Sequence, residues 1–210
     1  MEDVIFLNPL NKEPHNKDYA LREIIRMIDI TEGLLKIAIA YFTYSDIATA
    51  LIKRTERGRK TCLLLNTSDI LRPLSLTETE IVVSENLIKL LRLNSRWLEI
   101  RTLGFRTKTA YSNMHHKFMV SSNRLIFGSL NWTRSALDNN FEVIVVSDSL
   151  RLIDNFLSEF DLLWEHSQEF ISSDGKIRRI MCPICKSSEG IDFESYGPFC
   201  TFCSHQFKVV

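Results

Sequence analysis

The chain has 210 residues, of which 45% are hydrophobic and 25% charged, so it can form one domain of about 150 residues with a small appendage. Its 26 Lys and Arg residues balance 26 Asp and Glu residues, which excludes the strong positive field of a protein that coats nucleic acid without specificity. The N-terminus lacks a basic segment followed by an apolar run, and no stretch approaches about 18 consecutive apolar residues, so we expect a cytoplasmic protein without a membrane-spanning segment.

The first half of the chain alternates between helical and strand patterns. Apolar spacing predicts a helix over residues 21–29, and a continuous apolar run predicts a buried strand over 35–42. Ser45 is the expected N-cap of a helix that extends through Ile52, and a second buried strand follows at 61–65. This order is a βαβ unit, which predicts parallel strands.

The second half supplies further elements of both kinds. We expect helices over residues 80–93 and 150–164, and strands over 97–102, 114–120, 124–127 and 141–146. The predicted fold class is therefore α/β, with a mixed sheet flanked by helices.

Two short patterns at predicted strand ends carry residues suited to phosphodiester chemistry. One pairs His115 with Lys117, and the other places Ser129 and Asn131 directly after Gly128. Neutral imidazole can attack phosphorus, imidazolium can protonate a leaving oxygen, and lysine, serine and asparagine can hold the negative oxygens of the transition state. Side chains alternate along a strand, so the first and third residues of the His-x-Lys pattern share one face.

These residues resemble the phospholipase D superfamily, and the resemblance spans roughly residues 35 to 166. It rests on the following segments: Tyr41-Phe42-Thr43, Arg57-Gly58, Met114-His115-His116-Lys117-Phe118, Gly128-Ser129-Leu130-Asn131-Trp132-Thr133, Asn140 with Glu142, and the helix from Phe160 to Trp164. The chain is most similar to small members with a single motif, namely the bacterial endonucleases and the Zucchini-type mitochondrial proteins.

The resemblance implies a homodimer in which two copies of the motif meet to form one active site. One His115 would be the nucleophile that becomes a phosphohistidine, and the second copy would be the general acid. Lys117 and Asn131, with Ser129, would bind the phosphate, and Glu142 would orient the imidazole. No metal ion would be needed for catalysis.

One position departs from the family pattern. The family has an Asp where this chain has Ser122, five residues after Lys117. In the family that Asp mainly supports the loop, so its replacement affects the expected rate and loop geometry more than the type of reaction. A catalytically weakened protein is one reading of this change.

The C-terminal segment contains two Cys-x-x-Cys pairs separated by fourteen residues, formed by Cys182, Cys185, Cys200 and Cys203. Four thiolates at this spacing are typical of a structural zinc site. A module this small buries little core, so zinc binding is expected to supply its folding energy. We therefore predict a phospholipase D-like catalytic domain over residues 1–168, a linker over 169–180 and a four-cysteine zinc ribbon over 181–210.

The leading functional prediction is a metal-independent nuclease that acts on DNA or RNA. The enzymatic alternative is a phospholipid hydrolase of the cardiolipin type, although no membrane-docking segment is evident. The non-enzymatic alternative is a nucleic-acid-binding or scaffold dimer that has lost activity. A small nuclease would need restraint by a regulatory protein partner or by substrate choice, and phage defence is the hypothesis for its biological setting, which requires that cells lacking the protein resist phage less well.

Overall fold

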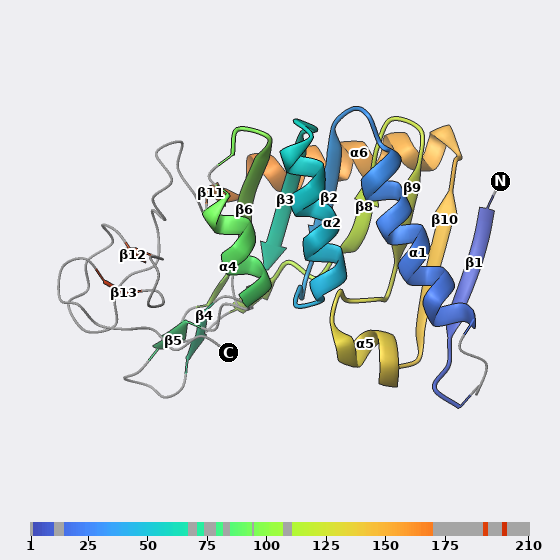
Figure 1. Cartoon of the computed structure of the whole chain (residues 1–210), viewed down its shortest axis with the longest axis horizontal. Coiled ribbons are helices and arrows are strands. Elements are labelled where there is room, and N and C mark those ends of the chain that lie inside the picture. Colours follow the sequence, from blue (N-terminus) through green and yellow to red (C-terminus); the bar gives the residue numbers. More distant parts are fainter. Residues whose placement is uncertain are drawn as a thin grey trace.

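A computed structural model of the chain describes residues 2–10, 15–66, 71–73, 79–81, 85–93, 95–106, 111–169, 191–192 and 199–200. In this part of the chain, nine strands form one mixed β-sheet in the order β1-β10-β9-β8-β2-β3-β6-β11, with β7 paired to β6. Helices lie on both faces of the sheet (Figure 1). The predicted α/β fold with a mixed sheet is therefore confirmed.

The centre of the sheet is parallel. Strand β2 (Leu35–Ile39) pairs with β3 (Thr61–Asn66), and β3 pairs with β6 (Leu98–Arg106). Helix α2 (Ser45–Glu56) connects β2 to β3, and α4 (Glu85–Arg92) lies between β3 and β6 in the chain. Helix α2 is thus the crossover connection that a pair of parallel strands requires, and β2, α2 and β3 form the predicted βαβ unit.

The other half of the sheet is antiparallel. Strand β8 (Lys117–Val120) pairs with β2, β9 (Leu125–Gly128) with β8, β10 (Glu142–Ser147) with β9, and β1 (Glu2–Leu7) with β10. Because neighbouring directions alternate, the C-terminal ends of β2 and β9 and the N-terminal ends of β8 and β10 lie at the same edge. This edge is named the carboxyl edge, since the parallel strands end there.

The remaining described strands are short. They are β7 (Tyr111–Asn113) and β11 (Gln168–Glu169), which pair with β6, together with the two-stranded sheets β4 (Leu71–Pro73) with β5 (Thr79–Ile81) and β12 (Ile191–Asp192) with β13 (Phe199–Cys200).

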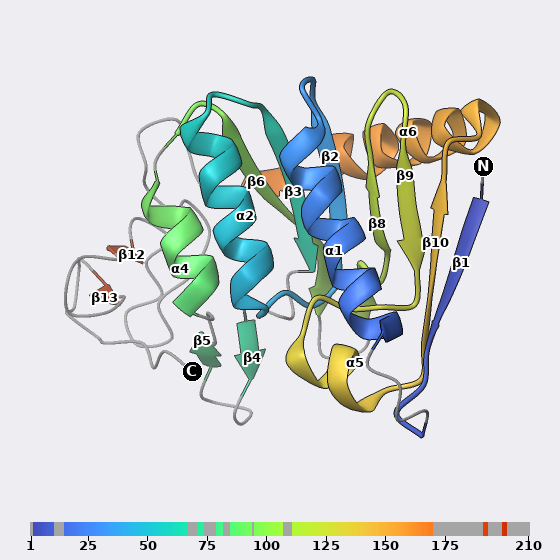
Figure 2. The ribbon, with the colours of Figure 1, turned by 45° about the vertical axis from the view of Figure 1, so that its right-hand side comes forward.

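Helices α1 (His15–Ile30), α2 and α4 cover one face of the sheet, and α6 (Leu150–Glu165) covers part of the other (Figures 1 and 2). Helix α6 packs on β2, β8 and β9 and crosses the strands at the end opposite the carboxyl edge, whereas α5 (Arg134–Asn139) lies at the carboxyl edge. None of the helices in the described ranges is long and apolar enough to span a bilayer.

Arg54 fixes the first helices to the sheet. Its side chain is fully buried, and its guanidinium donates to Thr61 Oγ1 at 2.9 Å and to the carbonyl oxygens of Ile28, Gly33 and Lys60 at 3.0, 2.5 and 3.1 Å. Burial lowers the pKa of this guanidinium to about 10, so it remains charged at neutral pH. One cation therefore joins the end of α1, the loop before β2 and the start of β3.

The structure corrects several predicted boundaries near the N-terminus. Helix α1 begins at His15, six residues before the predicted start, and strand β1 was not predicted. Ser45 was expected to cap α2, but the cap residue is Tyr44, and Ser45 is the first residue of the helix. The hydroxyl of Ser45 contacts the adjacent Asp46 side chain at 3.3 Å and leaves the helix end without a side-chain cap.

Two further predicted elements begin later in the chain than expected. The helix expected over residues 80–93 begins only at Glu85, because Glu80 pairs with Arg72 in the β4–β5 hairpin. The strand expected over 114–120 begins at Lys117, so His115 lies just before β8. Local apolar spacing does not reveal which of these residues find a pairing partner elsewhere in the chain.

Candidate active site

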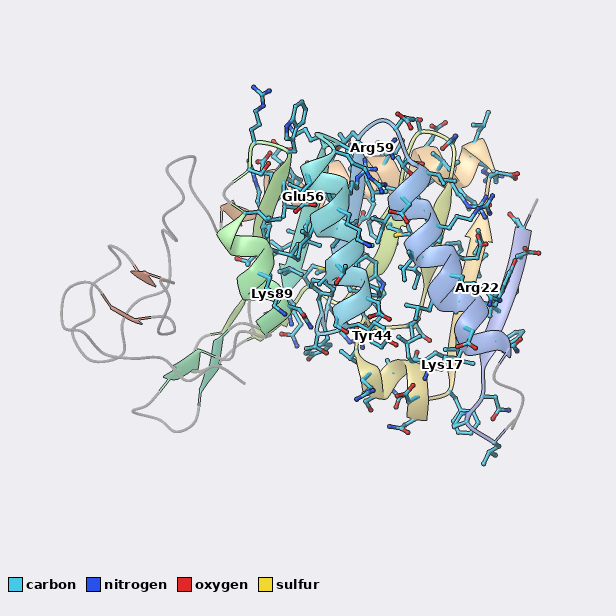
Figure 3. The ribbon with its side chains drawn as sticks, in the orientation of Figure 1. Lys17, Arg22, Tyr44, Glu56, Arg59 and Lys89 are labelled. Carbon is cyan, nitrogen blue, oxygen red and sulfur yellow. The ribbon has the colours of Figure 1, made fainter. Side chains whose placement is uncertain are left out.

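The carboxyl edge brings together all five residues that the sequence predicted for the active site. Lys117 is the first residue of β8 and pairs with Ile39 at the end of β2. Ser129 follows β9, and its backbone N–H donates to Val143 O at 2.9 Å, which places it beside Glu142. Figure 3 shows Lys17 and Tyr44 at the same edge, near the lower ends of α1 and α2.

His115 presents an exposed imidazole at this edge. Within the described residues this ring has no hydrogen-bond partner, and its nearest aromatic neighbour is Tyr41, with the ring centroids 6.5 Å apart and the planes at 81°. Partial burial, and then the charges of Lys117 and His116, hold the pKa of His115 below its ordinary value. The lowered pKa favours the neutral imidazole, the form in which a histidine acts as a nucleophile.

His116 points to the opposite face of the sheet. Its Nε2 lies 3.2 Å from Glu159 Oε1 on α6, and its ring meets Phe118 edge to face with centroids 5.8 Å apart. Side-chain alternation predicted that His115, and not His116, shares a face with Lys117. The geometry agrees with this choice, although β8 begins three residues later than expected.

Lys117 supplies the positive charge of the site. Its half-buried side chain folds back so that Nζ donates to His115 O at 2.8 Å. Burial lowers the pKa of Lys117, and the nearby negative charge of Glu142 opposes this shift by favouring the ammonium form. The cation and the imidazole thus occupy the same corner of the sheet.

Glu142 is held by hydrogen bonds to both carboxylate oxygens. Ser129 Oγ donates to Oε2, and Asn140 Nδ2 donates to Oε1 at 3.1 Å. Ser129 Oγ also accepts from Val143 N at 3.0 Å. Sequence analysis assigned no role to Asn140, although its place two residues before Glu142 and after the α5 turn was a usable signal.

The loop that carries Asn131 is tied to the end of β2. Trp132 N donates to Tyr41 O at 3.0 Å, and Trp132 O accepts from the backbone N–H groups of Thr43 and Tyr44 at 2.8 and 3.0 Å. The Trp132 side chain is buried against Phe42. Asn131 Oδ1 is buried and has no hydrogen-bond partner within the described residues.

The family described as "Cardiolipin synthase, PLD-like domain" matches residues 24–164, which is more than half of the chain. The chain belongs to the phospholipase D-like family. The predicted family and its fold are confirmed.

The curated relatives of the phospholipase D-like chain are named mitochondrial cardiolipin hydrolase. The human protein is 45% identical over 53 residues, covering 25% of this chain and 21% of the relative, and the protein of Chlamydomonas reinhardtii is 46% identical over 59 residues, covering 28% and 26%. The zebrafish (Danio rerio) protein is 39% identical over 72 residues, covering 32% of each chain. The chain thus spans about a third or less of the relatives it matches.

Two solved structures are similar over most of the chain. NucT from Helicobacter pylori has a TM-score of 0.64 at 23% identity and covers 81% of this chain and 99% of its own. Nuc from Salmonella typhimurium, a phospholipase D family member, has a TM-score of 0.59 at 19% identity and covers 82% and 99%. At these identities the likeness concerns the fold.

Ser122, where the family has an Asp, lies away from the site. It is exposed in the turn between β8 and β9, at the end of β8 opposite Lys117. The turn is closed by Ser121, whose Oγ contacts Asn123 Oδ1 at 3.0 Å and whose N–H donates to Arg124 O at 2.9 Å. Neighbouring residues therefore stabilise this turn in place of the family's Asp.

The predicted zinc ligands fall outside what can be described. Cys182, Cys185 and Cys203 lie beyond the described residues, and Cys200 is known only as part of β13. Within the described ranges, no group of three or more His, Cys, Asp or Glu residues could hold a metal ion. The four-cysteine site stays a prediction.

The environment of His115 leads to a pH prediction. Because burial and then Lys117 disfavour the imidazolium, His115 should lose its proton at a lower pH than an ordinary histidine, and the neutral nucleophile should persist as the pH falls. An NMR titration of the imidazole Cε1–H should show a lowered midpoint, and Lys117→Gln should move that midpoint upward by removing the nearest cation. A wild-type midpoint at or above the ordinary value would contradict this description of the site.

Proposed function

We propose that the protein is a metal-independent phosphodiesterase that cleaves DNA or RNA through a phosphohistidine at His115. The observation that carries the proposal is the exposed imidazole of His115, free of hydrogen bonds to described residues, at the same edge as the Lys117 ammonium and the side chain of Asn131, whose amide N–H groups can donate to a phosphate oxygen. This arrangement leaves the nucleophile accessible and surrounds it with phosphate-binding groups.

The reaction proceeds in two displacements. An imidazole nitrogen donates its electron pair to phosphorus, the bond from phosphorus to the leaving oxygen breaks, and that oxygen takes a proton from the second copy of His115. Water, deprotonated by this second copy, then displaces the phosphoryl group from the first. Lys117 and Asn131 bind the phosphate, whereas Ser129 holds Glu142, since its hydroxyl proton is already donated to that carboxylate.

An accessible edge with positive side chains suits a polyanionic polymer. His115 and Ser129 are exposed, and Arg134, which begins α5 directly after the Asn131 loop, has a side chain that is 89% exposed. Such groups can follow a phosphate backbone past the reacting phosphate. The curated relatives, which are named cardiolipin hydrolases, favour a phospholipid phosphodiester as the second candidate substrate.

We further propose that the active unit is a homodimer, since one chain supplies a single His115 to a reaction that uses two imidazoles. Ile5 and Leu7 of β1 pack in the core beside α1, so Val4 and Phe6 project from the opposite face of the sheet. They are 53% and 64% exposed, and Phe141, next to Glu142, is 64% exposed. A second copy would bury this apolar face, and each side chain fully buried contributes about 1.5–3 kcal/mol.

We propose that Cys182, Cys185, Cys200 and Cys203 hold one structural zinc ion. Four thiolates leave no open coordination position, so this zinc takes no part in the reaction. The ribbon would contact the nucleic acid or a regulatory protein partner. What supports this proposal is the cysteine spacing.

The activity can be tested with purified wild-type protein and the His115→Ala variant on end-labelled single- and double-stranded DNA and RNA in EDTA. Wild type should cleave at least one polymer, and His115→Ala should be slower by about a thousandfold or more, because the nucleophile and the acid are both lost. His116→Ala is the matched control and should retain activity, since its ring faces α6.

Light scattering shows whether each variant in that experiment keeps its oligomeric state, and atomic emission before chelation shows its zinc content. One zinc ion per chain supports the four-cysteine site, and none contradicts it. Cleavage of cardiolipin in vesicles, with no cleavage of any nucleic acid, would show that the substrate is a phospholipid. Binding of nucleic acid without cleavage, equal in wild type and His115→Ala, would indicate a binding protein.

The proposed dimer predicts a specific effect of charge on the β1 face. Phe6→Asp should convert a wild-type dimer into a folded monomer and abolish cleavage, because a buried carboxylate in an apolar interface is costly. Ile30→Asp is the control, since Ile30 is 51% exposed at the end of α1 on the other face. Size-exclusion chromatography with light scattering measures the mass, and a fully active dimer of Phe6→Asp would rule out this face as the interface.

A further inference from the structure

Tyr41 has a fixed position that its sequence context does not explain. It follows β2 by two residues, and its carbonyl accepts from Trp132 N at 3.0 Å. The next residue, Phe42, forms a parallel bridge with Trp132 and is only 2% exposed. The backbone of Tyr41 is therefore held by the same contacts that hold the Asn131 loop.

The Tyr41 side chain lies in a different environment from that of its neighbour Phe42. Whereas Phe42 fills the core, Tyr41 is half-buried and its ring adjoins the imidazole of His115, with centroids 6.5 Å apart. At an interplanar angle of 81° the two rings meet edge to face and do not cover one another. The Tyr41 hydroxyl has no hydrogen-bond partner within the described residues, so no hydrogen bond in this part of the structure accounts for a tyrosine here.

We propose that Tyr41 is a stacking platform for the nucleobase next to the scissile phosphate. The inference rests on the proposed nuclease function and adds a base-binding subsite to it. A phosphate bound at His115 and Lys117 places the attached sugar and base within a few ångströms of the imidazole, where the rigid ring of Tyr41 stands. Stacking on an aromatic face accepts every base, so the subsite raises affinity for a base-bearing strand without selecting its sequence.

The experiment distinguishes the effect of the Tyr41 ring from the effect of its hydroxyl and from any change in the stability of the loop. The variants are Tyr41→Phe, which keeps the ring, Tyr41→Leu, which removes it, and Tyr44→Leu, which removes a ring that packs on the core in the same loop. Thermal unfolding confirms that each is folded. Cleavage is measured on a short single strand of the polymer that wild type cuts, and on the same strand with tetrahydrofuran abasic units at its central positions.

We expect Tyr41→Leu to raise KM on the normal strand about tenfold, with kcat much less affected, and to cut the abasic strand as wild type does. Tyr41→Phe and Tyr44→Leu should resemble wild type on both strands. An equal loss by Tyr41→Leu on both strands, or no loss on either, would overturn the base-binding role. Failure of wild type to cut either strand would reject the nuclease activity, and this inference with it.

Discussion

The close approach of β9 to β10 at Gly128 is the constraint on which the site depends. A Cβ at this position, where φ is +158°, would overlap the carbonyl oxygen of Val143, so only glycine allows the two backbones to meet. That contact places Ser129 against Glu142 and turns the following loop toward the end of β2.

Two backbone junctions therefore define the candidate active site. The first is the Gly128 contact, which belongs to the antiparallel half of the sheet. The second is formed by Trp132, whose N–H and carbonyl bond to the segment after β2 and thereby join the antiparallel half to the βαβ unit. Lys117, the first residue of β8, and His115, just before this strand, lie between these junctions. The side chains that would bind phosphate are thus carried by backbone segments that these hydrogen bonds hold in place, which favours preorganisation of the site.

Structural features that depend on neighbouring residues in the sequence could be predicted from it. Apolar runs predicted β2 and β3, and the His-x-Lys and Gly-Ser-x-Asn patterns identified residues that the fold places together. The role of Tyr41 could not be predicted, because it depends on a contact with His115, which lies far away in the sequence. The start of α4 was missed for the same reason, since Glu80 pairs with Arg72 in a hairpin whose partner strand local periodicity does not reveal.

The central claim is that His115 forms a covalent bond to phosphorus, and mass spectrometry of the enzyme quenched with base during turnover tests it directly. We expect an adduct on the peptide that contains His115 in which the phosphorus still carries the part of the substrate that remains esterified to it. This adduct should be stable in base, labile in acid and absent from His115→Ala. Cleavage by wild type with an unmodified His115 throughout turnover would contradict the account and would point to direct attack by water.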